Sequence, residues 1–186
     1  MMDLPPYPGE PPKRLFFALP CAPAQRKAIA RWRNTLGRGA GRPVPAENFH
    51  VTMLFLGAVP VTLIPAICAA AASVKVPGRP LELTLDRLKA WRKANVLVLA
   101  PTEAPALLGR FVYALQEALR PLGLANEYRE YRPHLTLLRD WRSPEPEAAE
   151  APEFHLRADH FVLYESHKGA YRALAQWPLK VQPAAG

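Results

Sequence analysis

Cysteine is scarce in this sequence: Cys21 and Cys68 are the only two among 186 residues. Two thiols exclude a disulfide framework and any zinc or iron–sulfur site built from four cysteines. Long apolar runs are also missing. The longest covers residues 63–74 and contains Pro65, whereas a membrane-spanning helix needs about 20 apolar residues. The first residues carry no basic patch followed by an apolar run, so they predict no secretory signal. We therefore expect a soluble, cytoplasmic protein with no membrane partner.

Acidic residues are in the minority, with 16 Asp and Glu against 24 Lys and Arg, which gives a formal net charge of +8. Arginine supplies 17 of the 24 cations. A planar guanidinium can hold a phosphate group through two hydrogen bonds, so an arginine-rich surface favours nucleic acid or nucleotide partners. Solubility alone would account for the same excess, and charge by itself leaves both interpretations open.

Strand-like and helix-like segments alternate along the chain, whose length suits one domain. β-branched, aromatic or alternating apolar residues predict strands at 14–19, 49–56, 81–85, 95–99, 134–138, 159–165 and 170–176. Apolar residues at helical spacing predict helices at 23–36, 62–74 and 102–122. Paired strands with helices between them indicate an α+β protein with antiparallel sheet.

Local signals predict where the three helices begin and end. Gly37 and Gly123 follow the first and third helix as C-terminal stops. Thr62 and Thr102 stand where N-caps would lie. The proline-rich segment 142–153 predicts a surface connection. An apolar stripe predicts the buried face of the third helix, formed by Leu108, Phe111, Val112, Leu115 and Leu119.

An internal repeat is the most specific feature of the sequence. His50 and Thr52 lie in one predicted strand as H-V-T-M, and His134 and Thr136 lie in another as H-L-T-L, 84 residues later. Side chains alternate between the faces of a strand, so each copy presents an imidazole and a hydroxyl on one face and aliphatic residues on the other. The separation is nearly half the chain, which predicts two similar lobes that share a central cleft.

Two imidazole–hydroxyl pairs suit an in-line displacement at phosphorus. Such a reaction needs a base beside the entering oxygen and an acid beside the leaving oxygen, on opposite sides of the phosphorus. Histidine, with an ordinary pKa near 6.5, can serve either role around neutrality. The threonine hydroxyls can donate hydrogen bonds to the non-bridging oxygens, where charge is held in the transition state.

The paired H-x-T-x motifs resemble the signature of the two-histidine (2H) phosphoesterase superfamily. RLFFAL near the start, GRPVPAENFHVTMLFLG at 41–57 and RPHLTLLRD at 132–140 are similar to the bacterial RNA 2′,3′-cyclic phosphodiesterase branch, also called 2′-5′ RNA ligase. The resemblance implies a bilobal 2H phosphoesterase fold, in which two pseudo-symmetric lobes of antiparallel sheet and helices flank the cleft. With it we expect a flexible N-terminus at 1–12, one bilobal domain at 13–182 and a flexible tail at 183–186.

The same resemblance implies the reaction and its residues. RNA 2′,3′-cyclic phosphate ends would be opened to 2′-phosphomonoesters without metal or cofactor, with a reversible 2′-5′ joining of tRNA halves as a second activity. His50 matches the proton donor to the 3′ leaving oxygen, and His134 matches the base that activates water. The substrate contacts are matched by the phosphate-binding hydroxyls Thr52 and Thr136, the basic residue Arg139 and the base-stacking aromatic Phe55. We expect the protein to act as a monomer.

Two positions do not fit a simple strand model of the second motif. Arg139 has the opposite parity to His134, so it reaches the site only if the strand bends or ends there. Arg132 stands where relatives often have the first histidine of a His-Pro-His run, which leaves the catalytic position intact and affects only a secondary contact.

Two other classes of function remain open from the sequence. The first is a 2H phosphodiesterase that acts on a small cyclic nucleotide instead of an RNA end. The second is a non-catalytic module that binds RNA ends without turnover. The net charge and the motif context favour RNA, and the presence of both histidines and both threonines favours an enzyme.

We predict that activity survives chelation of divalent metals. The motifs contain no third ligand with usable spacing for a metal site, and proton transfer between imidazoles requires no metal. Hydrolysis of a 2′,3′-cyclic phosphate should therefore proceed at an unchanged rate in excess EDTA. Loss of activity that a divalent ion restores would contradict this mechanism.

Overall fold

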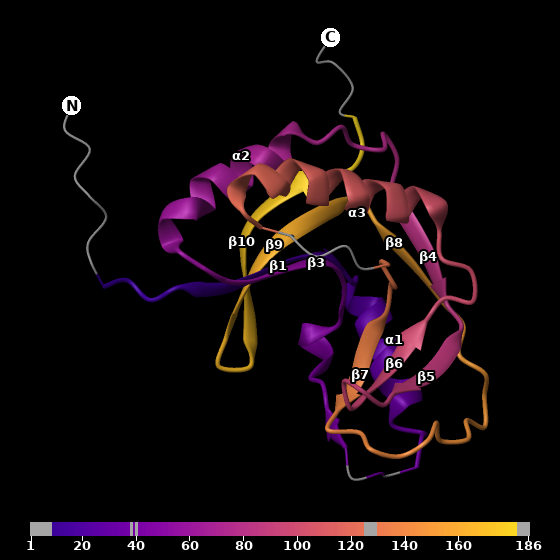
Figure 1. Cartoon of the computed structure of the whole chain (residues 1–186). Helices are drawn as coiled ribbons and strands as arrows, with labels where there is room; N and C mark the ends of the chain where they lie inside the picture. The colour runs from indigo at the N-terminus through magenta and orange to yellow at the C-terminus, as the bar shows by residue number, and fades with distance from the viewer. Residues whose placement is uncertain (1–8, 38, 40, 125–129, 182–186) are drawn as a thin grey trace, which may run out of the picture.

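Strands and helices alternate along the chain as the sequence predicts (Figure 1). The computed structural model describes residues 9–37, 39, 41–124 and 130–181. The β-strands are β1 (Lys13–Pro20), β2 (Arg42–Pro43), β3 (His50–Val59), β4 (Leu81–Leu85), β5 (Arg87–Trp91), β6 (Val96–Ala100), β7 (Leu135–Arg139), β8 (Phe154–Ala158), β9 (His160–His167) and β10 (Ala170–Pro178). The α-helices are α1 (Pro23–Arg33), α2 (Ile64–Ser73) and α3 (Ala106–Leu119), and the 3-10 helices are η1 (Ala46–Asn48), η2 (Val61–Leu63) and η3 (Arg120–Leu122).

The strands form two four-stranded sheets and a short ribbon. The first sheet has the order β10-β9-β1-β3, the second has the order β2-β7-β6-β5, and β4 pairs with β8. Neighbouring strands are antiparallel throughout. The predicted α+β class with antiparallel sheet is therefore confirmed. Each of the two larger sheets contains one of the H-x-T motifs.

Two full strands were not predicted from the sequence. In β5, the sequence RLKAW does alternate, with Arg87 and Lys89 on one face and Leu88 and Ala90 on the other, but the segment is short and contains no β-branched residue. In β8, the sequence FHLRA is short and follows the proline-rich segment 142–153, which does form a connection without helix or strand. Both strands exist because a neighbouring strand, β6 or β4, supplies their hydrogen-bond partners.

The helix ends differ from three of the four local predictions. Thr62 lies in the 3-10 turn η2, and no side chain caps α2. The backbone N–H of Thr102 donates to Asp86 Oδ1 at 2.7 Å, so this residue belongs to the preceding loop and α3 begins only at Ala106. Helix α1 ends at Arg33, before Gly37, because its last turn tightens into bonds from N–H groups to carbonyls three residues earlier. The stop at Gly123 is confirmed, in a left-handed conformation that glycine adopts readily.

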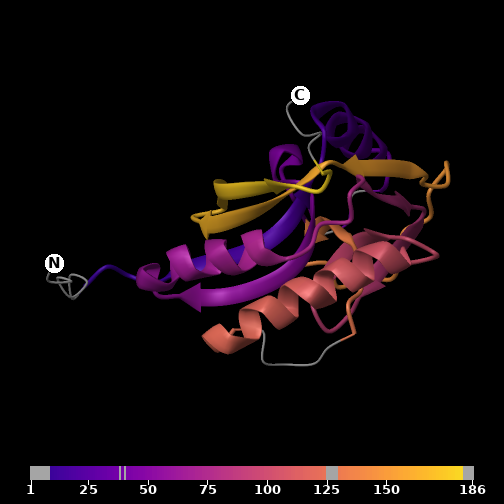
Figure 2. The same ribbon diagram turned by 90° about the horizontal axis from the view of Figure 1, so that it is seen from above.

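Each sheet has one face in the main core. From the first sheet the core receives residues such as Leu15 and Phe17, and from the second sheet it receives Leu97 and Leu99. Helices α2 and α3 pack against each other over the elements that carry this core (Figure 2). The five apolar residues predicted for the buried stripe of α3 are all buried in it. No helix in the described part of the chain is long and apolar enough to span a membrane.

The two larger sheets meet where β3 contacts β7. Tyr131, just before β7, donates a hydrogen bond from its hydroxyl to the backbone carbonyl of Thr52 in β3, at 2.8 Å. Burial raises the pKa of Tyr131, so this donor keeps its proton. The contact therefore brings together the two strands that carry the repeated motifs.

Candidate active site

Each motif lies at the beginning of its strand. His50 is the first residue of β3, and His134 immediately precedes β7. The predicted alternation is present, since the aliphatic residue after each histidine, Val51 or Leu135, is fully buried in the core. Both histidines are only partly buried, so their imidazoles lie on the opposite, outer face. Thr52 is almost covered on that same face, at 8% exposure.

A β-bulge follows the first motif. Neighbouring residues of β1 pair with Thr52 and Leu54, so Met53 is an extra residue with no partner opposite it. A bulge of one residue reverses the side-chain parity of the rest of the strand. Phe55 consequently lies on the same face as His50 and Thr52, although its position in the sequence alone would place it on the core face.

The second motif contains a bulge at the equivalent position. Neighbouring residues of β6 pair with Thr136 and Leu138, which leaves Leu137 as the extra residue. Arg139 is thereby returned to the face of His134 and Thr136 and is exposed. The strand irregularity that Arg139 requires is therefore present. Phe55 and Arg139 occupy corresponding places, each the fifth residue after its histidine.

Both imidazoles are oriented by the same backbone contact. Nδ1 of His50 lies 2.6 Å from the carbonyl oxygen of Asn48, and Nδ1 of His134 lies 2.8 Å from the carbonyl oxygen of Arg132. A carbonyl can only accept, so Nδ1 carries a proton in each ring and Nε2 is left to exchange protons. Nε2 of His50 is also 2.9 Å from the hydroxyl of Thr52. When His50 is neutral, its Nε2 accepts a hydrogen bond from that hydroxyl.

Burial keeps both histidines neutral in the free protein. Burial lowers the pKa of His50 to about 4, opposed by its bond to Asn48 and assisted by the positive charges of Arg139 and His134. Burial also lowers the pKa of His134, assisted by Arg132 and Arg139 and opposed by the bond to the Arg132 carbonyl. These mutual effects place the two imidazoles and Arg139 within one electrostatic environment. A bound phosphate anion would stabilise the charged imidazolium forms and so raise the pKa of both histidines again.

Aromatic rings from the first sheet surround His50. The ring of Phe16 lies 5.0 Å from the imidazole, and that of Tyr171 lies 5.2 Å away, edge-on. Arg139 of the second sheet reaches across to the hydroxyl of Tyr171 at 3.4 Å, near the limit for a hydrogen bond. Phe55 is 67% exposed and packs against Phe16 at 5.9 Å, so one of its faces is free for a ligand.

His134 has a different neighbour, which the sequence reasoning missed. The ring of Trp91 in β5 lies 4.3 Å from the His134 imidazole, and the Arg132 guanidinium lies 5.0 Å from the same indole. Arg132 thus contacts the site through Trp91. Arg87, Lys89 and Trp91 lie on alternate residues, so in a strand they would share one face. This signal could have indicated Trp91, but only once the segment is known to be a strand. Tyr171 was missed because the sequence predicts its strand but does not show which strand it pairs with, or which residues lie opposite each other.

The described residues contain no group of three or more His, Cys, Asp or Glu side chains that could hold a metal ion. The groups that the site does present have distinct chemical capacities. Two Nε2 atoms can exchange protons, hydroxyls and a guanidinium can bind phosphate oxygens, and an exposed ring can stack on a base. All six residues predicted from the sequence belong to this outer face of the two sheets.

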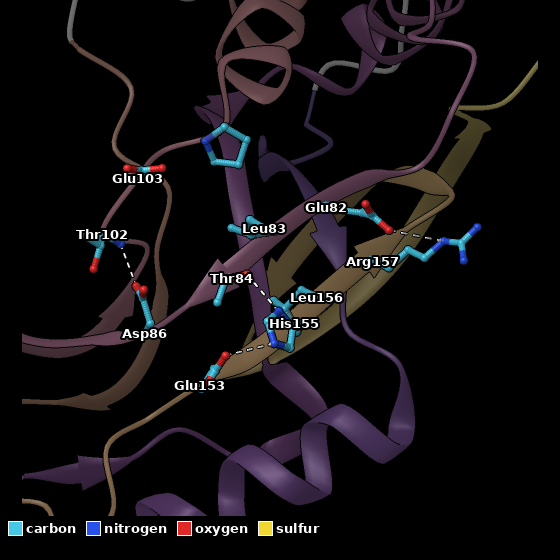
Figure 3. A pocket seen from close by; sticks show the side chains of 11 residues that line it. Glu82, Leu83, Thr84, Asp86, Thr102, Glu103, Glu153, His155, Leu156 and Arg157 are labelled. Carbon is cyan, nitrogen blue, oxygen red and sulfur yellow. Dashed lines mark hydrogen bonds and ion pairs between the residues drawn. The ribbon is translucent and has the colours of Figure 1, made fainter.

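A hollow of about 690 Å³ lies at the β4–β8 ribbon, and Figure 3 shows the side chains that line it. Its histidine already has two partners: His155 bonds through Nδ1 to the Thr84 hydroxyl at 2.9 Å and pairs through Nε2 with Glu153 at 3.3 Å. None of the predicted site residues lines it. The histidine pair therefore remains the candidate active site.

Comparisons with known proteins agree with this geometry. The family model "LigT like Phosphoesterase" matches residues 19–98 and again residues 98–174, so each match contains one motif. The chain is 33% identical over 175 residues to the RNA 2′,3′-cyclic phosphodiesterase of Escherichia coli (strain K12), covering 90% of this chain and 97% of that protein.

Two solved structures are similar over nearly the whole chain. A crystal structure of a phosphoesterase has a TM-score of 0.81 and 31% identity, covering 91% of this chain and 99% of that one. The crystal structure of E. coli LigT complexed with 3′-AMP has a TM-score of 0.80 and 31% identity, covering 92% of this chain and 100% of that one. The fold and the two-lobed arrangement predicted from the motifs are thereby confirmed.

Acid should destabilise the folded protein through His50. Its pKa is about 4 in the folded state and about 6.5 when unfolded, so between these values only the unfolded chain takes up the proton. The contribution of His50 to the stability of the folded protein is complete above pH 6.5 and falls as the pH drops towards 4. Between pH 7 and pH 5 the loss from this group is about 2 kcal/mol.

Urea unfolding of the wild type and of His50→Gln at both pH values measures this contribution. The free energy of unfolding should drop less in the variant, by that amount, because glutamine does not titrate. An identical pH dependence in the two proteins would contradict the lowered pKa.

Proposed function

The chain belongs to the LigT-like phosphoesterase family, and on this premise we propose that it opens RNA 2′,3′-cyclic phosphate ends to 2′-phosphomonoesters. The observation that carries the proposal is the matched pair of imidazoles, each with Nδ1 bound to a backbone carbonyl, so that Nε2 is the nitrogen that can exchange a proton. In His50 this nitrogen also contacts the Thr52 hydroxyl. The name of the E. coli relative supplies the substrate class, and the 3′-AMP complex of E. coli LigT shows a nucleotide bound to a protein of this fold.

The proposed reaction is an in-line displacement in which His134 is the base and His50 is the acid. A water molecule attacks phosphorus and gives its proton to Nε2 of His134. The bond from phosphorus to the 3′ oxygen breaks, and that oxygen receives the proton from Nε2 of His50. The 2′ ester remains, so the product carries a 2′-phosphate. Each proton transfer typically contributes about 10²–10⁴-fold to the rate.

His50 must be protonated to act as the acid, although burial lowers its pKa to about 4 in the free protein. The negative charge of the bound phosphodiester favours the imidazolium. The Asn48 carbonyl, which accepts from Nδ1, stabilises the same charged form. Substrate binding should therefore be accompanied by uptake of a proton at His50. No metal or cofactor is needed for either transfer.

The other four residues are proposed to hold the substrate. The hydroxyls of Thr52 and Thr136 lie on the face of the imidazoles and can donate to the non-bridging oxygens. Arg139, whose charge acts on both histidines, supplies the cation for the phosphate. Phe55, with one ring face exposed, is placed to stack on the terminal base.

The family resemblance extends the proposal to the biological setting. We propose that the protein works as a monomer in the cytoplasm, that tRNA halves are one source of its RNA ends, and that it also catalyses reversible 2′-5′ joining. Opening and joining can share one site because joining is the same displacement at phosphorus: an RNA 5′-hydroxyl attacks in the place of water, and the 3′ oxygen leaves with a proton as before.

Incubation with a 2′,3′-cyclic mononucleotide and with a cyclic-ended RNA 10-mer tests the proposed function. Turnover of the RNA to a 2′-phosphate end is the expected result. Turnover of the mononucleotide alone would favour a small-nucleotide phosphodiesterase, and binding without turnover would favour an RNA-end binding module. His155→Ala is a matched control, because this histidine lies on the β4–β8 ribbon, outside the two sheets that carry the motifs, and pairs with Glu153.

A sulfur substitution distinguishes the acid from the base. A 3′-alkoxide leaves poorly without a proton, whereas a 3′-thiolate needs little proton assistance. His50→Ala should therefore lose about 10²–10⁴-fold on the normal cyclic phosphate and recover most of that loss on the 3′-thio analogue. His134→Ala should be impaired on both substrates. The opposite pattern would exchange the two roles, and equal losses for both variants on both substrates would contradict acid–base catalysis.

A further inference from the structure

We call the outer face of the two larger sheets, which carries both histidines, the active face. Its two halves differ in chemistry although each contains one copy of the H-x-T motif. On the first sheet, the residues that face His50 are mainly aromatic, namely Phe16, Phe55, Tyr164 and Tyr171. Arg14 joins this face only at the far end of β1, two residues beyond Phe16. The second sheet is different, because the residues around His134 are mainly cations.

The strand register places these cations on the active face. Val98 of β6 pairs with Thr136 on one side and with Lys89 on the other. Val96 pairs in the same way with Arg139 and with Trp91. Residues that lie directly opposite each other in an antiparallel pair point to the same face. Lys89 and Trp91 therefore share the face of Thr136 and Arg139.

Burial and side-chain contacts support this assignment independently. Leu97 and Leu99 belong to the main core, whereas Val96 and Val98 are buried outside it. The two valines must therefore lie under the opposite, active face. The contact of Trp91 with the His134 ring places β5 beside the active site on that face. Arg87, exposed and two residues before Lys89, lies on the same face of β5.

The active face of the second sheet consequently carries a cluster of positive charge. Its cations are Arg42, Arg87, Lys89, Arg132 and Arg139. Two carboxylates lie near them. Asp140 pairs with Arg42 at 3.2 Å. Glu145 accepts the backbone N–H of Ala90 at the outer edge of β5, and this hydrogen bond, with smaller contributions from the charges of Lys89 and Arg92, lowers its pKa. An excess of positive charge remains, concentrated on β5 and β7.

We propose that the RNA strand on the 5′ side of the cyclic end crosses the second sheet from β7 to β5, with its backbone phosphates on Lys89 and Arg87. We call these two residues the basic track. The terminal base then lies on the aromatic face of the first sheet. A groove of cations with interleaved aromatic rings is the typical surface for single-stranded nucleic acid. This inference rests on the proposed function, which supplies RNA as the ligand.

The dimensions of the sheet fit this path. Thr136 and Lys89 are separated by two inter-strand spacings of about 4.8 Å, which is roughly 10 Å. Stacked nucleotides place one phosphate per about 3.4 Å of strand axis, so the basic track lies within two or three nucleotides of the reacting end. A mononucleotide would not reach it, and longer RNA would.

The test compares two double variants that remove equal charge. Arg87→Gln/Lys89→Gln removes the basic track, and Lys75→Gln/Arg110→Gln removes exposed cations after α2 and on α3, the helix that packs on the core side. The track variant should lower the ratio of kcat/KM for a cyclic-ended 10-mer to that for a cyclic mononucleotide by roughly tenfold at 50 mM salt. The slope of log affinity against log salt for a 2′-phosphate-ended 10-mer should fall by about 1.4, since each single-strand phosphate contact accounts for about 0.7. The control variant should match the wild type in both measurements.

Conservative and chemical substitutions complete the test. Arg87→Lys/Lys89→Arg keeps both charges and should restore the wild-type slope, which excludes misfolding as the cause of a loss. Methylphosphonates at the second and third linkages from the cyclic end should weaken binding by the wild type but not further weaken binding by the track variant, because both changes remove the same contacts. Equal affinities for the two double variants, or additive effects of variant and methylphosphonate, would overturn the basic track. Absence of cyclic phosphate opening by the wild type would instead overturn the proposed function, while the binding measurements would still decide the basic track.

Discussion

A single extra residue in each motif strand is the constraint on which the active face depends. Without the bulges at Met53 and Leu137, strand alternation would turn Phe55 and Arg139 towards the core. A buried, unpaired guanidinium is very costly, so that arrangement would not be stable. The bulges resolve this conflict in both sheets at the same distance from the histidine. Each lobe thereby presents three side chains, at the first, third and sixth positions of its motif, on one face.

The contact between β3 and β7 converts two such faces into one site. Tyr131 holds Thr52 of the other lobe through its hydroxyl, and Arg139 reaches the Tyr171 hydroxyl across the same junction. The lobes therefore place two imidazoles in one electrostatic environment, where burial favours their neutral forms. Such a site is suited to an anionic substrate, because the bound phosphate compensates the cost of protonating the acid.

The two motifs are similar, but the residues around their histidines are not. His50 packs against Phe16 and Tyr171, whereas His134 packs against Trp91, which also contacts a guanidinium. A pseudo-two-fold arrangement would by itself leave the direction of an RNA strand undefined. Unequal neighbours remove this ambiguity, since bases favour aromatic rings and backbone phosphates favour cations. The difference between the lobes thus gives the substrate one orientation.

The sequence by itself determined the motifs, the α+β class, the resemblance to the 2H phosphoesterases and the buried stripe of α3, because these depend on residues close together in the chain. Only the tertiary structure decided which side chains share the active face. Strand β5 shows why: the alternation in RLKAW is too short to identify its partner strand, and only the pairing with β6 puts Trp91 beside His134. The bulges, and the start of α3 at Ala106 after Thr102 bonds to Asp86, likewise follow from partners distant in the sequence. Non-local hydrogen bonds set strand register, and register sets the face of every side chain.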